Sequence, residues 1–73
     1  MAEFTQYEVW GFDKDGSPEF RETTTRKAEA MKIGRAAAKQ YQRVELEKCN
    51  YLGENDLDQT ALIAAWENGI QTA

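Results

Sequence analysis

The chain has 73 residues, a length that suits one domain and leaves little room for an enclosed catalytic cleft. It contains no histidine and one cysteine, Cys49, which excludes imidazole-based catalysis, zinc sites of the Cys/His type and an internal disulfide. The net charge of −4 disfavours general binding to nucleic-acid phosphates.

Two strands joined by a tight turn are predicted first. Residues 4–12 are rich in aromatic and β-branched side chains and alternate apolar with polar, which is typical of a strand. Asp15 and Gly16 supply the backbone conformation that a hairpin turn needs. Residues 19–24 then resume as a second strand, with Phe20 as its main apolar anchor.

A helix is predicted next, over residues 26–40, with Thr25 as its N-cap. Its apolar residues recur at helical spacing and are mostly small, so the helix can lie close to a sheet. Three basic residues fall on roughly the opposite side, as a solvated surface or as a contact for phosphates or an acidic protein. The apolar stripe is Ala30, Ile33, Gly34, Ala37 and Tyr41, and the basic residues are Lys32, Arg35 and Lys39.

Residues 43–51 are predicted as a third strand in which alternate side chains face the core. A loop follows, and residues 59–68 are predicted as a second helix capped by Asp58. Gly69 would take the left-handed position after the last turn of this helix. The predicted buried side of the second helix comprises Ala61, Leu62, Ala65 and Trp66.

This order of elements predicts a single α+β domain over residues 1–73, with a two-layer ββαβα fold. A hairpin followed by a right-handed crossover favours a three-stranded antiparallel sheet in the order 2-1-3, packed on the Ala-rich helix. The C-terminal helix would cover an edge or an end of the core. The second face of the sheet has nothing in the sequence to cover it, so we expect that face to meet a partner.

Two groups of side chains are candidates for binding a partner. Trp10 and Phe12 share a strand face with Glu8, and they form either buried core or an exposed aromatic interface. An acidic cluster precedes the predicted second helix, where it either compensates the helix dipole or contacts a basic groove. The predicted partner-binding residues are Trp10, Phe12, Glu8, Glu45, Glu47, Glu54, Asp56 and Asp58.

The leading hypothesis is a non-enzymatic module without a cofactor or metal that binds another protein. One alternative is a single-stranded nucleic-acid-binding protein that uses Trp10, Phe12, Arg21 and Arg43 together with the basic helix. A second alternative is a structural subunit of a homo-oligomer, such as a homodimer. The unpaired cysteine, the absence of signal-peptide features at the start and the shortness of every apolar run indicate a cytoplasmic protein rather than a membrane protein.

At a coarser level the chain resembles small bacteriophage-encoded accessory proteins, including anti-CRISPR-like inhibitors. The resemblance lies in the segment Tyr7-Glu-Val-Trp-Gly11, the Asp15-Gly16 turn, the Ala-rich stretch of residues 31–40 and the small acidic outline. It implies a phage or mobile-element inhibitor that docks on a nucleic-acid-handling host protein and blocks its function. It assigns no individual site residue.

Overall fold

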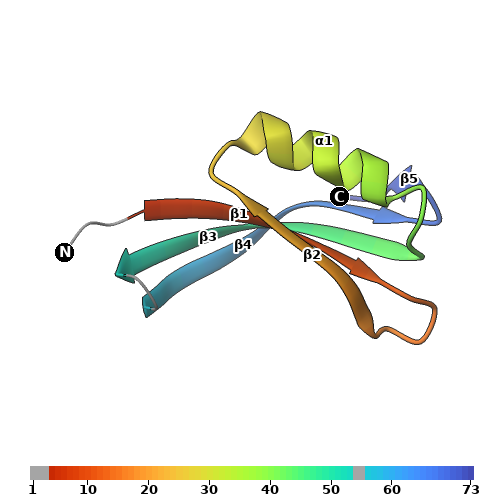
Figure 1. Cartoon of the computed structure of the whole chain (residues 1–73), viewed down its shortest axis with the longest axis horizontal. Coiled ribbons are helices and arrows are strands. Elements are labelled where there is room, and N and C mark those ends of the chain that lie inside the picture. The colour runs from red at the N-terminus through yellow and green to blue at the C-terminus, as the bar shows by residue number, and fades with distance from the viewer. Residues whose placement is uncertain (1–3, 54–55) are drawn as a thin grey trace.

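The computed structural model describes residues 4–53 and 56–73, and it shows a five-stranded antiparallel sheet with a helix on one face (Figure 1). The strands lie in the order β2-β1-β3-β4-β5. The elements are β1 (Phe4–Phe12), β2 (Pro18–Thr24), α1 (Lys27–Ala37), β3 (Arg43–Gly53), β4 (Asp56–Glu67) and β5 (Ile70–Gln71).

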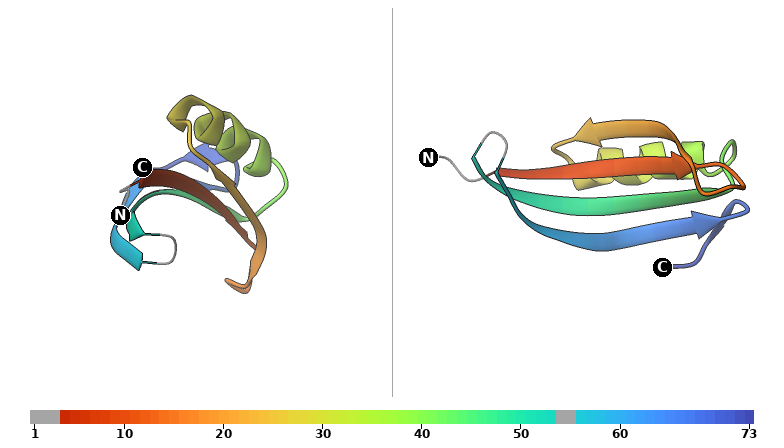
Figure 2. Two further views of the ribbon diagram at one scale, coloured as in Figure 1. Left: turned by 60° about the vertical axis from the view of Figure 1, so that its left-hand side comes forward. Right: turned by 90° about the horizontal axis from the view of Figure 1, so that it is seen from below.

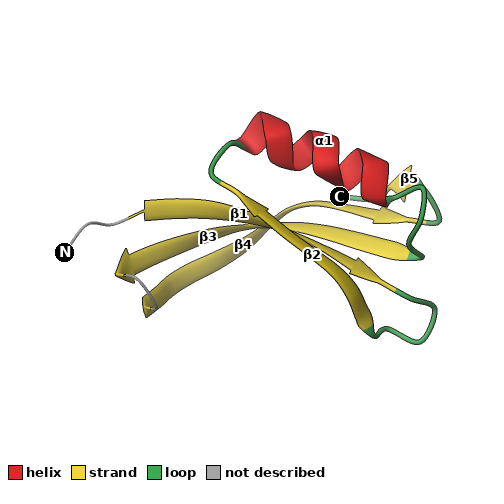
Figure 3. Ribbon diagram, viewed as in Figure 1, coloured by secondary structure: helices red, strands yellow, loops and turns green. Residues whose placement is uncertain are grey.

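The predicted fold class is wrong in its C-terminal third. Residues 59–68, which we expected to form a second helix capped by Asp58, lie mostly in β4, a long strand that pairs with β3 (Figure 3). The chain is apolar at every position from Ala61 to Trp66, and a continuous apolar run of this kind fits a buried strand as well as a helix. Pairing decides between them, because a helix here would leave the backbone of β3 without a second neighbour.

The Asn68-Gly69 pair forms the turn between β4 and β5. Both residues have positive φ angles, 52° and 82°, as a two-residue type I′ hairpin requires. The flanking Glu67 and Ile70 are paired across the turn. Gly69 therefore takes the left-handed conformation that we predicted, but it does so in a hairpin and not at the end of a helix.

The helix α1 is shorter than the predicted range 26–40 and begins differently. Arg26, not Thr25, is the N-cap residue, and it makes no capping hydrogen bond through its side chain. The Thr24 hydroxyl oxygen accepts a 3.3 Å hydrogen bond from the Arg26 N–H. With 11 residues, α1 is too short to cross a lipid bilayer, and no other helix occurs in residues 4–53 and 56–73.

The core lies between α1 and one face of the sheet. Val9, Val44 and Leu46 are fully buried there, beneath the small residues of the helix. Trp66 of β4 is 3 % exposed and lies against the helix backbone, so that a Cβ atom on Gly34 would sit 2.6 Å from its Cη2 atom. The small residues of α1 thus contact a tryptophan that the sequence pattern assigns to a second helix.

α1 covers only part of the sheet. The ends of β1, β3 and β4 that lie near residues 4, 53 and 56 project beyond the helix (Figures 1 and 2). Within the larger sheet, β2, β1 and β3 lie in the order 2-1-3. The C-terminal segment extends the sheet sideways as β4 and β5, and in the described residues it does not cover the second face.

Candidate docking face

The face of the sheet opposite α1 carries alternate side chains of β1, β2, β3 and β4, and we call it the open face. In the described part of the chain, no element packs over it (Figure 2). Its members are Phe4, Gln6, Glu8, Trp10, Phe12, Pro18, Arg21, Thr23, Arg43, Glu45, Glu47, Cys49, Tyr51, Leu57, Thr60, Leu62, Ala65 and Glu67.

A buried carboxylate organises the centre of the open face. Glu8 is 7 % exposed, accepts hydrogen bonds from the Tyr51 hydroxyl (2.8 Å) and the Trp10 Nε1 (3.2 Å), and forms an ion pair with Arg21 (3.3 Å). Burial acts to raise the pKa of Glu8, but these three partners outweigh it and the pKa is lowered. The same hydrogen bond raises the pKa of Tyr51 to about 12. Glu8 is therefore a fixed anion that orients its neighbours.

The Glu8 carboxylate holds an aromatic pair in place. Trp10 stacks on Phe12 with ring centroids 6.4 Å apart and 17° between the planes. The Arg21 guanidinium lies 5.3 Å from the centroid of the Trp10 ring, within the range of a cation–π contact. Both rings are half-buried. The position of Trp10 is thus set by a stacking partner, a cation and a hydrogen bond.

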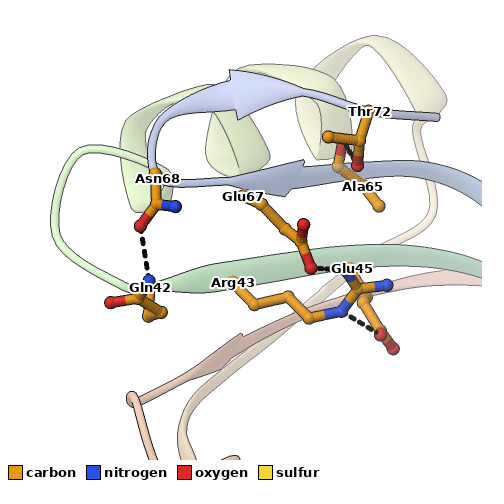
Figure 4. A network of polar contacts seen from close by, with 7 residues as sticks. All are labelled: Gln42, Arg43, Glu45, Ala65, Glu67, Asn68 and Thr72. Carbon is orange, nitrogen blue, oxygen red and sulfur yellow. Dashed lines mark hydrogen bonds and ion pairs between the residues drawn. The ribbon is translucent and has the colours of Figure 1, made fainter.

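A second polar cluster lies at the end of the open face near the Asn68-Gly69 turn (Figure 4). Arg43 contacts Glu45 at 2.7 Å and Glu67 at 2.6 Å. The hydrogen bond to Glu45, followed by the contact with Glu67, raises the pKa of Arg43 against the effect of burial. Both arginines of the open face are therefore paired with carboxylates. With two arginines against the four glutamates Glu8, Glu45, Glu47 and Glu67, the face is acidic.

Glu47 and Cys49 lie between these two clusters and have no basic partner among the described ion pairs. Burial, followed by the negative charges of Glu45 and Glu8, raises the pKa of Glu47. Burial, followed by the charge of Glu8, also raises the pKa of the Cys49 thiol, which favours its protonated form. Among the residues described, no group of three or more Cys, Asp or Glu side chains is placed to hold a metal ion.

Replacing Glu47 by Gln is expected to stabilise the protein at pH 7. The pKa of Glu47 is raised on folding, so its ionised form destabilises the folded state at any pH above that value. The gain should vanish at about pH 3.5, where the residue is protonated in both states. Urea denaturation of the wild type and Glu47→Gln at the two pH values measures the change in the free energy of unfolding. Glu22→Gln, the same change on exposed β2, should shift stability by less than about 0.5 kcal/mol.

Other predicted site residues lie away from this centre. Glu54 lies outside the described residues, and Asp56 begins β4. Asp58 is exposed within β4, so the interpretation of these acids as compensation for a helix dipole is wrong. The basic residues Lys32 and Arg35 are exposed on α1, on the other side of the sheet from the open face. Lys39 is exposed in the turn that follows α1.

Sequence reasoning missed the apolar part of the open face. Phe4 stacks on Tyr51, with centroids 4.8 Å apart and 9° between the planes, because the antiparallel register of β1 and β3 places them opposite each other. Phe4 is 40 % exposed and Leu62 is 51 % exposed. No local pattern reveals such a cross-strand pair, since the two residues of the aromatic stack are 47 positions apart.

No protein-family model matches the chain, and searches of curated proteins and of solved structures likewise give no match.

Proposed function

We propose that the protein is a non-enzymatic module that binds another protein through the open face. The observation that carries this proposal is the half-exposed Trp10–Phe12 pair, held by the Glu8 network on a sheet face that no described element covers. Tryptophan is enriched among residues that dominate binding energy, and a side chain fixed before binding loses little conformational entropy. Trp10 combines a large aromatic side chain with a conformation that is fixed before binding.

The charge of the face selects the kind of partner. Glu45 and Glu47 flank the centre, and the two arginines that could meet phosphates are engaged by carboxylates. A basic protein surface complements this arrangement, whereas single-stranded nucleic acid would meet a net negative platform. We therefore favour a protein partner over the nucleic-acid alternative.

The resemblance to phage inhibitors adds a narrower prediction about that partner. A surface that binds nucleic acid is basic, so an acidic face that docks on it would block its substrate site. A nucleic-acid-handling protein is the partner that we predict on this basis.

Replacing Trp10 by Ala tests the proposal. We expect the variant to stay folded and to lose about 2 kcal/mol of binding free energy, about thirtyfold in affinity, because the anchor of the interface is gone. Wild-type and variant proteins are immobilised and exposed to a native lysate. Retained proteins are identified by mass spectrometry, and their affinities are then measured by calorimetry.

Ile70→Ala is the matched control for this experiment. Ile70 is 69 % exposed on β5, three strands away from Trp10 on β1, so its loss should leave the captured proteins unchanged. A protein that is lost with Trp10→Ala and retained with Ile70→Ala supports the proposal. An identical set of captured proteins for all three chains contradicts it, as does unfolding of the Trp10 variant, which would place Trp10 in the core.

A further inference from the structure

The two edges of the sheet differ in their protection against pairing with another strand. One edge strand of the sheet is β2, which carries Pro18 and the charged residues Glu19, Arg21 and Glu22. Proline and charge are the usual means by which an edge strand avoids pairing. On the other side, β4 has no charged residue and no proline from 59 to 66.

The strand β5 covers only one end of the β4 edge. Backbone hydrogen bonds from the C-terminal segment reach Ala65, whose N–H donates to Ala73 and whose carbonyl accepts from Thr72 (2.8 Å). Pairing with β5 continues at Trp66 and Glu67. In the described chain, no strand pairs with the outer side of residues 57–64, and Figure 2 shows this part of β4 along the rim of the sheet.

The register identifies which backbone groups point outward. The backbone N–H and carbonyl of Ala65 bond to the C-terminal segment, so they point away from β3. In an antiparallel ladder the residue directly opposite then also points its backbone groups away, so Glu45 directs its own groups toward β1. The β1–β3 register has no shift, so Cys49 also directs its backbone groups toward β1. Thr60 lies opposite Cys49 and therefore directs its own N–H and carbonyl away from β3. The same reasoning applies to Leu62, which lies opposite Glu47.

We propose that residues 59–62 of β4 pair antiparallel with the same segment of a second copy of this chain, forming a symmetric homodimer. With Ala61 opposite Ala61 of the second copy, Thr60 and Leu62 exchange backbone hydrogen bonds across the two-fold axis. This register uses the groups that point outward. It also buries part of Leu62, which is 51 % exposed in the single chain.

The charges agree with a second copy as the occupant. Each chain has a net charge of −4, so two chains repel each other least where their contact carries no like charges. In this register, Asp58 faces residues 63–64 of the second copy, which are uncharged. β-Bulges interrupt the β3–β4 ladder on both sides of residues 59–62, and they limit the pairing to this segment.

The dimer would also double the open face. Antiparallel pairing of identical edge strands places the two-fold axis perpendicular to the sheet, so both α1 helices lie on one side and both open faces on the other. A partner with two matching sites would then bind both Trp10 side chains. The dimer does not depend on the proposed function, because Trp10 lies on β1 and away from the β4 edge.

Sedimentation equilibrium of the full chain, from about 1 μM to about 500 μM, tests this proposal. We expect the wild-type mass to approach twice the 8.3 kDa of one chain as the concentration rises. Leu62→Lys places a charge at the contact, and Thr60→Pro removes an outward N–H without removing a β3–β4 hydrogen bond. Each should raise the dimer dissociation constant at least about tenfold.

Ile70→Lys is the matched control, since it makes the same chemical change on an exposed apolar residue of β5. It should leave the dimer unchanged, and far-UV circular dichroism should show all three variants to be folded. A wild-type mass of one chain over the whole range would overturn the proposal, as would equal dissociation constants for Leu62→Lys and Ile70→Lys. These results would leave the Trp10 capture experiment unaffected, so the two proposals fail separately.

Discussion

Trp66→Ala is expected to destabilise the fold by about 3–5 kcal/mol, the range measured when a large buried aromatic side chain is truncated. Trp66 is 3 % exposed and fills the space between β4 and α1, next to Gly34. Chains of this size have a net stability of only a few kcal/mol. The variant should therefore be largely unfolded at room temperature.

Far-UV circular dichroism and guanidinium denaturation of Trp66→Ala and Trp10→Ala compare the free energies of unfolding of the two variants. Trp10→Ala removes a side chain of the same type from the open face, where it is half-buried and not enclosed by the core. It should lose less stability than Trp66→Ala. Equal losses for the two variants would show that the sheet does not have one covered face and one open face.

Gly34→Ala is expected to destabilise the protein by about 2–3 kcal/mol, although alanine is the better helix former by about 1 kcal/mol. The added methyl group would lie 2.6 Å from Cη2 and 2.7 Å from Cζ3 of Trp66, closer than van der Waals contact allows. The ring is enclosed and cannot turn aside, so α1 would have to move away from the sheet.

A smaller ring at position 66 tests whether this overlap causes the loss of stability, or whether α1 tolerates no side chain at position 34. In a Trp66→Phe background the overlapping atoms are absent, and Gly34→Ala should then be neutral or stabilising, by up to about 1 kcal/mol. Thermal denaturation of the four proteins completes a double-mutant cycle. If the stability losses of Gly34→Ala and Trp66→Phe simply add in the double variant, the contact with Trp66 is not the reason for glycine at position 34.

The residues of the Glu8 network show why the site was only partly predictable. Alternation along β1 is a local property, so Glu8, Trp10 and Phe12 could be assigned to one face from the sequence. Their partners Tyr51 and Arg21 reach Glu8 from other strands, and only the strand registers bring them there. The sequence therefore predicted which side chains share the face, but not which carboxylate is buried or what holds it.

The sequence by itself determined the N-terminal hairpin, the central helix and the third strand, because each is specified by contacts among neighbouring residues: the turn at Asp15-Gly16, the helical spacing of small residues and the alternation around Val44. The tertiary structure alone decided the fate of residues 59–68. Their apolar run suits either element, and Asn68-Gly69 suits either a helix end or a hairpin. Strand pairing with β3 and the packing of Trp66 on Gly34 select the strand, since both depend on residues far away in the chain.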